Sequence, residues 1–180
     1  MGIGVHWGLF GVKAFLKMSN PTSPTAPKPA SPHEEQIVGR CEYALDGKRR
    51  LTLPAKWRAI WGDPGHVYVF PDLRERCLNI VTPEEMAKIK ERIKNENQNK
   101  PGFSSAMGRF CEHLECLELD IQNRIRICDA FLEFAELEST VVMIGGFERI
   151  RLWSPARKPA DKKVDQAGFA SACDELGVWI

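Results

Sequence analysis

Apolar and polar residues alternate in two short stretches on either side of residue 46. The apolar members are Cys41, Tyr43, Leu45, Leu51 and Leu53. A period of two predicts strands with one buried face. The dipeptide Asp46-Gly47 between the two stretches is typical of a tight hairpin turn. The pattern therefore predicts a hairpin whose tip carries three consecutive cations, Lys48, Arg49 and Arg50.

An Asp-x-x-x-Arg motif followed by alternating apolar residues occurs twice, as Asp46 with Arg50 and as Asp120 with Arg124, 74 residues apart. The apolar run 67–70 recurs at the same spacing as the run 141–144. Landmarks that keep their order and spacing predict an internal duplication.

Further elements are predicted from local signals. Helices are expected at 54–61, at 83–97 after the capping residue Thr82, and at 103–113, with strands at 66–70 and 77–81. Gly145-Gly146 is interpreted as a hairpin turn. The C-terminal tail has an apolar stripe at helical spacing, which we expect to pack on the domain or on a neighbouring subunit: Phe169, Ala172, Cys173, Leu176 and Trp179.

Each motif is followed by a helix-like run and a pair of strands, and the second copy ends with Trp153-Ser154. In these features the chain resembles the MraZ family of bacterial transcription factors. The resemblance covers residues 38 to 157. It implies an α+β fold with two pseudo-repeated AbrB-like swapped-hairpin β units and connecting helices. The family usually has glycine where this chain has Arg49 and Asn123, and proline where it has Cys128.

The expected domain order follows from the repeat and from composition. Residues 1–35, which include a proline-rich tract, are expected to form a disordered leader, with a partner-binding arm as the alternative. Residues 1–17 are suspected to precede the true start at Met18, and their apolar run is too short to cross a bilayer. The remaining divisions are a first SpoVT-AbrB-like domain at 38–83, a helical linker at 84–111, a second such domain at 112–156 and a tail at 157–180.

Charge distinguishes the two repeats, although the whole chain has a net charge of only +1. Residues 36–60 contain six cations and two anions, whereas residues 112–138 contain two cations and eight anions. Lysine and arginine bind nucleic acid by neutralising phosphates and releasing counterions. DNA binding is therefore predicted in the first repeat.

The predicted DNA-binding residues are Lys48, Arg49 and Arg50. Arg50 is the candidate for a base-edge contact, because a guanidinium pairs bidentately with guanine in the major groove. Lys48 and Arg49 are expected to reach phosphates. If position 49 requires a positive φ, its side chain costs about 1 kcal/mol there. A solvated hairpin tip without DNA contacts is the alternative.

The matching acidic residues have a different expected role. Asp46 is expected to organise its turn by accepting backbone hydrogen bonds or by pairing with Arg50. Asp120 and Arg124 are expected to do the same structural work in the second copy. Asn123 tolerates a positive φ better than Arg49 does.

Catalytic and metal-binding motifs are weak. Cys111, His113 and Cys116 provide three possible zinc ligands, but no nearby residue completes a tetrahedral set. No glycine-rich phosphate loop or nucleophile elbow occurs in the sequence. We expect no enzyme activity, no cofactor, no metal, no membrane partner and no small-molecule substrate. The scattered cysteines predict reduced thiols in a cytoplasmic protein. The resemblance implies that this protein is associated with the nucleoid.

The resemblance implies a ring-shaped homo-oligomer that binds short repeated boxes in double-stranded promoter DNA. The promoter would be that of a division and cell-wall gene cluster, and the effect repression. The alternative is a protein-interaction or scaffold module that has the same fold and has lost operator recognition.

Overall fold

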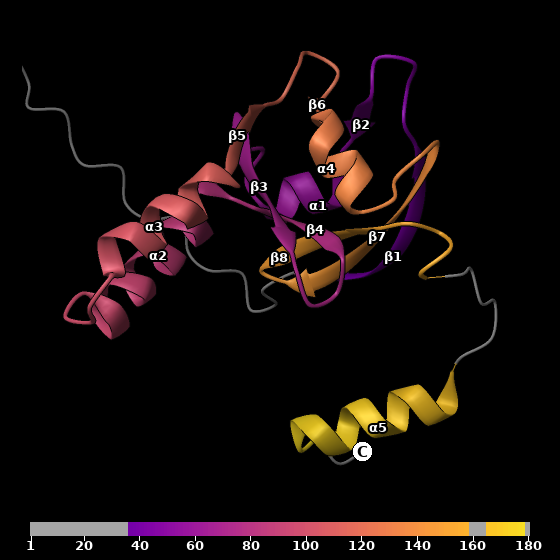
Figure 1. Ribbon diagram of the computed structural model, residues 1–180. Helices are drawn as coiled ribbons and strands as arrows, with labels where there is room; N and C mark the ends of the chain where they lie inside the picture. The colour runs from indigo at the N-terminus through magenta and orange to yellow at the C-terminus, as the bar shows by residue number, and fades with distance from the viewer. Residues whose placement is uncertain (1–35, 159–164, 179–180) are drawn as a thin grey trace, which may run out of the picture. The chain divides into compact units, whose positions relative to one another are not determined.

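The computed structural model describes residues 36–158 and 165–178 (Figure 1). The leader predicted at 1–35 lies outside the described residues. The elements in chain order are β1 (Ile37–Ala44), β2 (Arg50–Thr52), α1 (Ala55–Ile60), β3 (His66–Asp72), β4 (Cys77–Val81), α2 (Pro83–Asn97), α3 (Phe103–Glu112), β5 (Glu115–Glu118), β6 (Arg124–Arg126), α4 (Asp129–Phe134), β7 (Thr140–Phe147), β8 (Arg149–Trp153) and α5 (Gln166–Leu176). The fold combines helices with antiparallel sheets, as the α+β prediction requires.

The strands form two antiparallel sheets. The larger has six strands in the order β1-β7-β8-β4-β3-β5, and the smaller consists of β2 and β6. Strands β3 and β4 pair with each other, as do β7 and β8. In contrast, β1 pairs with β7 along its whole length, from Ile37 opposite Phe147 to Ala44 opposite Thr140. The six-stranded sheet is thus built from both halves of the chain.

The simple hairpin predicted around Asp46-Gly47 is wrong in its strand pairing. A turn does form, because the Asp46 N–H donates to the Arg50 carbonyl at 3.0 Å and the Arg49 N–H to the Asp46 carbonyl at 2.8 Å. The strands on either side then separate: β1 pairs with β7, and β2 pairs with β6. The reason is burial, since Leu51 lies opposite Ile125 and both side chains have 0% exposure.

One hydrophobic core contains residues from both copies of the Asp-x-x-x-Arg motif and from the strands that follow them. Its fully buried members include Leu51, Val67, Val69, Ile80, Ile125, Ile127, Met143, Ile150 and Leu152. Burying a side chain of this size contributes about 1.5–3 kcal/mol. The segments 38–83 and 112–156, here called the first and second segments, therefore stabilise each other.

The helices follow their sequence signals. The Thr82 hydroxyl accepts a hydrogen bond from the Glu85 N–H at 3.2 Å and caps α2, as predicted. Helix α1 is followed by Gly62 at φ 72°. Helix α5 confirms the helical spacing predicted in the tail, whereas Trp179 lies outside the described residues. No helix among the described residues is both long and apolar enough to cross a membrane.

The turn predicted at Gly145-Gly146 is wrong, because β7 continues through both residues. Gly145 lies against the β1 backbone, and a Cβ atom there would be 2.7 Å from the Ile37 carbonyl oxygen. The glycine therefore allows two strands to approach closely. The chain reverses two residues later, where Phe147 has φ 61° and the Glu148 N–H donates to the Gly146 carbonyl at 2.8 Å.

Candidate nucleic-acid interface

Two loops project on the same side of the molecule in Figure 1, one between β1 and β2 and the other between β5 and β6. They contain residues 46–50 and 120–124, here called the first and second turns. In each turn the aspartate Oδ1 accepts hydrogen bonds from the backbone N–H groups two and four residues later, at 2.8–3.0 Å. Asp46 and Asp120 thus hold their turns in the same conformation.

The arginine that ends each turn is paired with the aspartate that begins it. Arg50 Nε donates to Asp46 Oδ2 at 2.7 Å, and Arg124 Nε donates to Asp120 Oδ2 at 2.8 Å. The pairs also meet each other, since Arg50 Nη1 lies 3.6 Å from Asp120 Oδ2 and Arg124 Nη1 lies 3.5 Å from Asp46 Oδ2. The four side chains form one network that joins the two turns.

The network changes the pKa of both carboxyl groups. The side-chain hydrogen bond from Arg124 is the main cause that lowers the pKa of Asp120 to about 2. The pKa of Asp46 is also lowered, chiefly by the hydrogen bond from the Arg50 backbone N–H. Both carboxylates are therefore ionised at neutral pH, and the network carries two negative and two positive charges.

Position 49 and the matching position 123 both adopt the left-handed backbone conformation. Arg49 and Asn123 each have φ 60°. Asparagine tolerates this region, whereas an arginine there costs about 1 kcal/mol. The Arg49 guanidinium forms an ion pair with Asp129, the first residue of α4, while half of the Arg49 side chain stays exposed. The first turn is thereby linked to the second segment.

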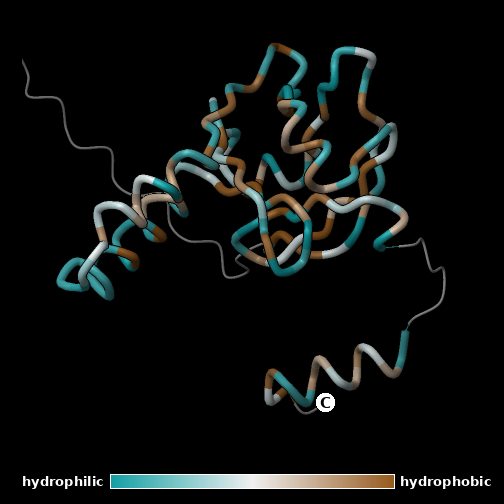
Figure 2. Tube along the Cα trace, in the orientation of Figure 1, coloured by the Kyte–Doolittle hydropathy of each residue, from teal (hydrophilic) through white to brown (hydrophobic). Residues whose placement is uncertain are grey.

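The tips of the two turns differ in chemistry. Lys48 is exposed, and its ammonium forms no ion pair with any other described residue. Ile121 and Gln122 occupy the corresponding part of the second turn, and Ile121 is 100% exposed. Figure 2 shows the contrast, with a brown apolar tip on the β5–β6 loop and a white to teal tip on the β1–β2 loop.

Sequence reasoning missed one cation. Arg126 lies directly opposite Arg50 in the two-stranded sheet, here called the ribbon, and Arg124 lies opposite Thr52. Residues that are directly opposite share a face, so these arginines point away from the buried pair Leu51 and Ile125. The signal was present, because Arg124-Ile125-Arg126 alternates in the strand period. The negative charge count of the second segment concealed it.

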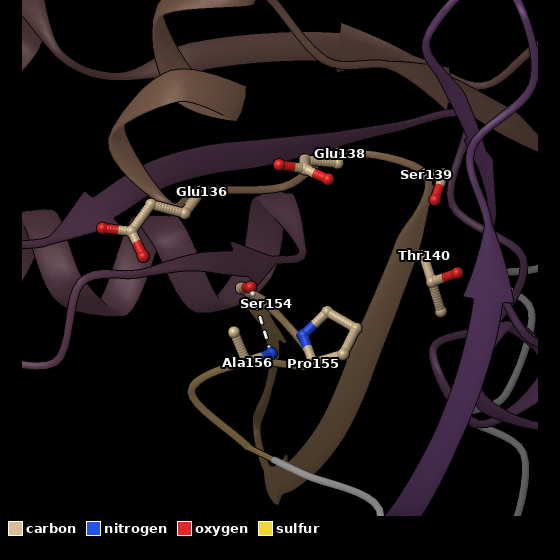
Figure 3. Close-up of a pocket in the computed structure, with 7 residues that line it drawn as sticks. All are labelled: Glu136, Glu138, Ser139, Thr140, Ser154, Pro155 and Ala156. Carbon is tan, nitrogen blue, oxygen red and sulfur yellow. Dashed lines mark hydrogen bonds between the residues drawn. The ribbon is translucent and has the colours of Figure 1, made fainter.

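The hollow drawn in Figure 3 has the opposite charge. It has a volume of about 510 Å³, and its lining includes Glu136, Glu138, Ser139 and Thr140. Arg157 donates to Glu136 at 2.8 and 3.0 Å, and this pairing is the main cause that lowers the pKa of Glu136. Carboxylates at this surface repel a phosphate. This hollow is therefore a poor candidate for binding nucleic acid, whereas the first turn and the outer face of the ribbon present exposed cations.

The sequence motif with three possible zinc ligands does not assemble into a site. In the ranges 36–158 and 165–178, no group of three His, Cys, Asp or Glu side chains is placed to hold a metal ion. Cys111 and Cys116 are both exposed free thiols.

Comparison with known proteins gives the relatives of the chain. No protein-family model matches it. A protein of Caldicellulosiruptor saccharolyticus named transcriptional regulator MraZ is 30% identical over 146 residues, which cover 79% of this chain and 99% of the relative. The proteins of the same name from Caldanaerobacter subterraneus and Thermoanaerobacter pseudethanolicus are 32% identical over 142 and 120 residues, covering 78% and 66% of this chain and 96% and 80% of the relatives.

These relatives are all named as one class of protein, transcriptional regulators, and the chain matches most of their length. The chain belongs to the MraZ family. The resemblance inferred from the tandem Asp-x-x-x-Arg motifs is thereby confirmed.

Proposed function

We propose that this protein is a non-enzymatic, sequence-specific DNA-binding transcriptional regulator. The observation that supports this most is the collection of cations on one surface: Lys48, Arg49, Arg50 and Arg126. The buried pair Leu51 and Ile125 holds the ribbon from behind. The names of the relatives agree with this function.

Arg50 is the proposed base-reading residue. A two-stranded ribbon fits the major groove, where a guanidinium pairs with the O6 and N7 atoms of guanine. Asp46 binds Nε of Arg50 at 2.7 Å, whereas the nearest cross-turn carboxylate is 3.6 Å from Nη1. An arginine has five N–H donors. The pairing thus fixes the orientation of Arg50 and leaves donors at its outer end for a base.

Lys48, Arg49 and Arg126 are the proposed phosphate contacts. Phosphate contacts position a protein on the duplex without reading sequence. Arg126 joins this group because it is exposed beside Arg50 on the outer face of the ribbon. Arg49 would share its charge between a phosphate and Asp129. The second segment therefore supplies one cation to a surface that the charge count assigned to the first segment alone.

We also propose that the fold consists of two AbrB-like swapped-hairpin units at 38–83 and 112–156, derived from one duplicated sequence. The cross-pairing of β1 with β7 and of β2 with β6 supports the exchange of strands. The starts of β2 and β6 are 74 residues apart, and so are the starts of α1 and α4. The shared network of Asp46, Arg50, Asp120 and Arg124 supports the same view.

The biological setting is proposed from the family. The chain would form a ring-shaped homo-oligomer on the nucleoid in the cytoplasm, bind short repeated boxes and repress the promoter of a division and cell-wall gene cluster. One turn with a few cations would bind weakly. Several identical turns on a ring raise the effective concentration at tandem sites. Sedimentation of the full chain tests the ring, and a monomer at micromolar concentration would exclude it.

The test of the DNA proposal compares Arg50→Ala with Arg124→Ala on duplexes from upstream of the gene and on shuffled duplexes. Both substitutions remove an arginine from the same network, so Arg124→Ala is the control for the loss of an arginine that pairs with its turn aspartate. Only Arg50→Ala should abolish discrimination between the two duplexes. Arg50→Lys should also lose discrimination, because lysine lacks the bidentate fork, while it keeps the salt dependence. Wild-type protein that binds neither duplex would instead support the interaction-module alternative.

A further inference from the structure

An apolar groove lies between α3, α4 and the end of β3. Its volume is about 590 Å³, and its apolar lining includes Phe70, Pro71, Leu73, Phe110, Phe131 and Phe134. The rings of Phe70 and Phe110 are 6.0 Å apart. Leu73 is 76% exposed at the edge of the groove. This lining is unlike the charged surface of the turns.

The tail contains a helix whose apolar residues are largely exposed in the part of the chain that the structure describes. Helix α5 is capped at both ends, since the Asp165 side chain accepts from the Gly168 N–H at 3.0 Å and Gly177 has φ 66°. Phe169, Cys173 and Leu176 share one face of this helix. Phe169 is 58% exposed and Leu176 is 78% exposed.

The length of α5 indicates that it needs a partner surface. It has 11 residues, and isolated helices shorter than about 12–15 residues are marginal in water. Most helical stability in proteins comes from packing an amphipathic face. Two caps and an apolar stripe are thus encoded in a segment whose helix would be stabilised by burial of the stripe.

We propose that α5 docks its Phe169 and Leu176 face into this groove of its own chain. Side-chain contacts connect the start of the tail to the Phe134 end of the groove: Arg157 pairs with Glu136 at 2.8 Å, Arg76 is 3.7 Å from Glu136, and the Arg76 guanidinium lies 5.9 Å from the Phe134 ring. Seven peptide steps separate Lys158 from Asp165 and span up to roughly 23 Å. The linker therefore lets α5 begin anywhere within about 23 Å of Lys158.

Charge also favours this occupant. Arg109 lines the groove, and Arg76 lies beside its Phe134 end. Helix α5 carries Asp174 and Glu175, and no basic residue occurs from 166 to 176. Asp174 and Glu175 lie on the side of α5 away from Phe169 and Leu176, so the opposite charges favour the approach of the helix, while the aromatic side chains supply the apolar contact. This docking is independent of the proposed DNA contacts.

The test is amide hydrogen exchange on the full chain. In the wild type we expect protection of α5 and of 103–112, and Phe169→Glu should abolish protection of α5 and lower that of 103–112. Glutamate has a higher helix propensity than phenylalanine, so the loss would not come from propensity. Ala167→Glu, on the opposite face of α5, is the matched control and should leave protection unchanged. Leu73→Glu should unprotect α5 from the groove side.

A second experiment separates docking within a chain from docking between copies. Equal amounts of protein labelled with nitrogen-14 and nitrogen-15 are mixed, unfolded and refolded together so that any oligomer contains both labels, and Cys173 is joined to Cys111 of α3 by a bifunctional maleimide. Crosslinked peptides with a single isotope are expected. Peptides with mixed isotopes would assign the groove to a second copy and overturn the proposal. Unchanged exchange in both Phe169→Glu and Leu73→Glu would also overturn it.

Discussion

The first and second turns have the same supporting hydrogen bonds and ion pair, here called the frame, and different residues at their tips. Each is held by an aspartate that accepts two backbone hydrogen bonds and pairs with an arginine four residues later. Each has a residue at φ 60° before that arginine. The tips are Gly47-Lys48-Arg49 in one and Ile121-Gln122-Asn123 in the other. The comparison separates residues that build the turn from residues free to carry a function.

The largest effect is expected from truncating the buried side chain of Ile125, which packs behind the ribbon that joins both turns. Ile125 is fully buried opposite Leu51, so Ile125→Ala should lower the free energy of unfolding by about 2–5 kcal/mol. Ile121, in the same segment, is 100% exposed. Ile121→Ala should therefore change the free energy of unfolding by less than about 0.5 kcal/mol. Urea unfolding of the two variants checks this, and equal losses would contradict the assigned burial.

Exchanging the tips tests their chemistry with the frame kept intact. Replacing Gly47-Lys48-Arg49 by the sequence Ile-Gln-Asn removes two proposed phosphate contacts. With a salt slope of about 0.9 per contact, affinity for DNA at 0.1 M salt should fall on the order of 60-fold. Fluorescence anisotropy with a labelled duplex measures the change. Placing Gly-Lys-Arg at 121–123 is the reciprocal control, and an unaltered affinity in the first exchange would remove the tip from the interface.

A smaller effect is expected at low pH, where the pairing of Asp120 should no longer stabilise the fold. The pKa of Asp120 is lowered to about 2, so its pairing contributes stability above its unfolded-state pKa, near 3.9. That contribution should be lost as the pH falls from about 4 through 2. The difference in Tm between wild type and Asp120→Asn should therefore shrink across this range. A difference in Tm independent of pH would show that Asp120 acts through something other than its charge.

The smallest expected effect concerns the ion pair of Arg49 with Asp129. Both side chains are at least half exposed, and exposed pairs contribute little. Asp129→Asn should free Arg49 for a phosphate and raise DNA affinity by up to about fivefold. Glu133→Gln, on the same helix, is the control for net charge. The effect should vanish in an Arg49→Ala background, and an equal gain in that background would point to general electrostatics instead.

Local patterns predicted much of the fold. The capping residue Thr82 of α2 and the local signals for α3, β3 and β4 lie within or next to the elements that they specify. The pairing of β1 with β7 joins residues about a hundred positions apart, and no local pattern encodes such a register. For the same reason Gly145 resembled a turn residue, although it serves a close approach of strands.

In the candidate site, too, the local features could be predicted from the sequence and the long-range neighbours could not. Lys48 and Arg49 could be placed at a tip from the sequence, and their exposure agrees with that placement. The position of Arg126 beside Arg50 depends on the cross-segment ladder, which only the structure provides. A charge count along the chain therefore misassigns a residue whose neighbours come from another segment.

The most direct measurement is photo-crosslinking to DNA. A photo-crosslinking amino acid is introduced at position 48 or at position 122, and each protein is irradiated while bound to upstream duplex DNA. Both positions are tips of turns with the same frame. The account predicts a protein–DNA crosslink from position 48 and little or none from position 122. A crosslink from position 122 alone, or from neither position while the duplex is bound, would contradict the claim that the first turn meets DNA.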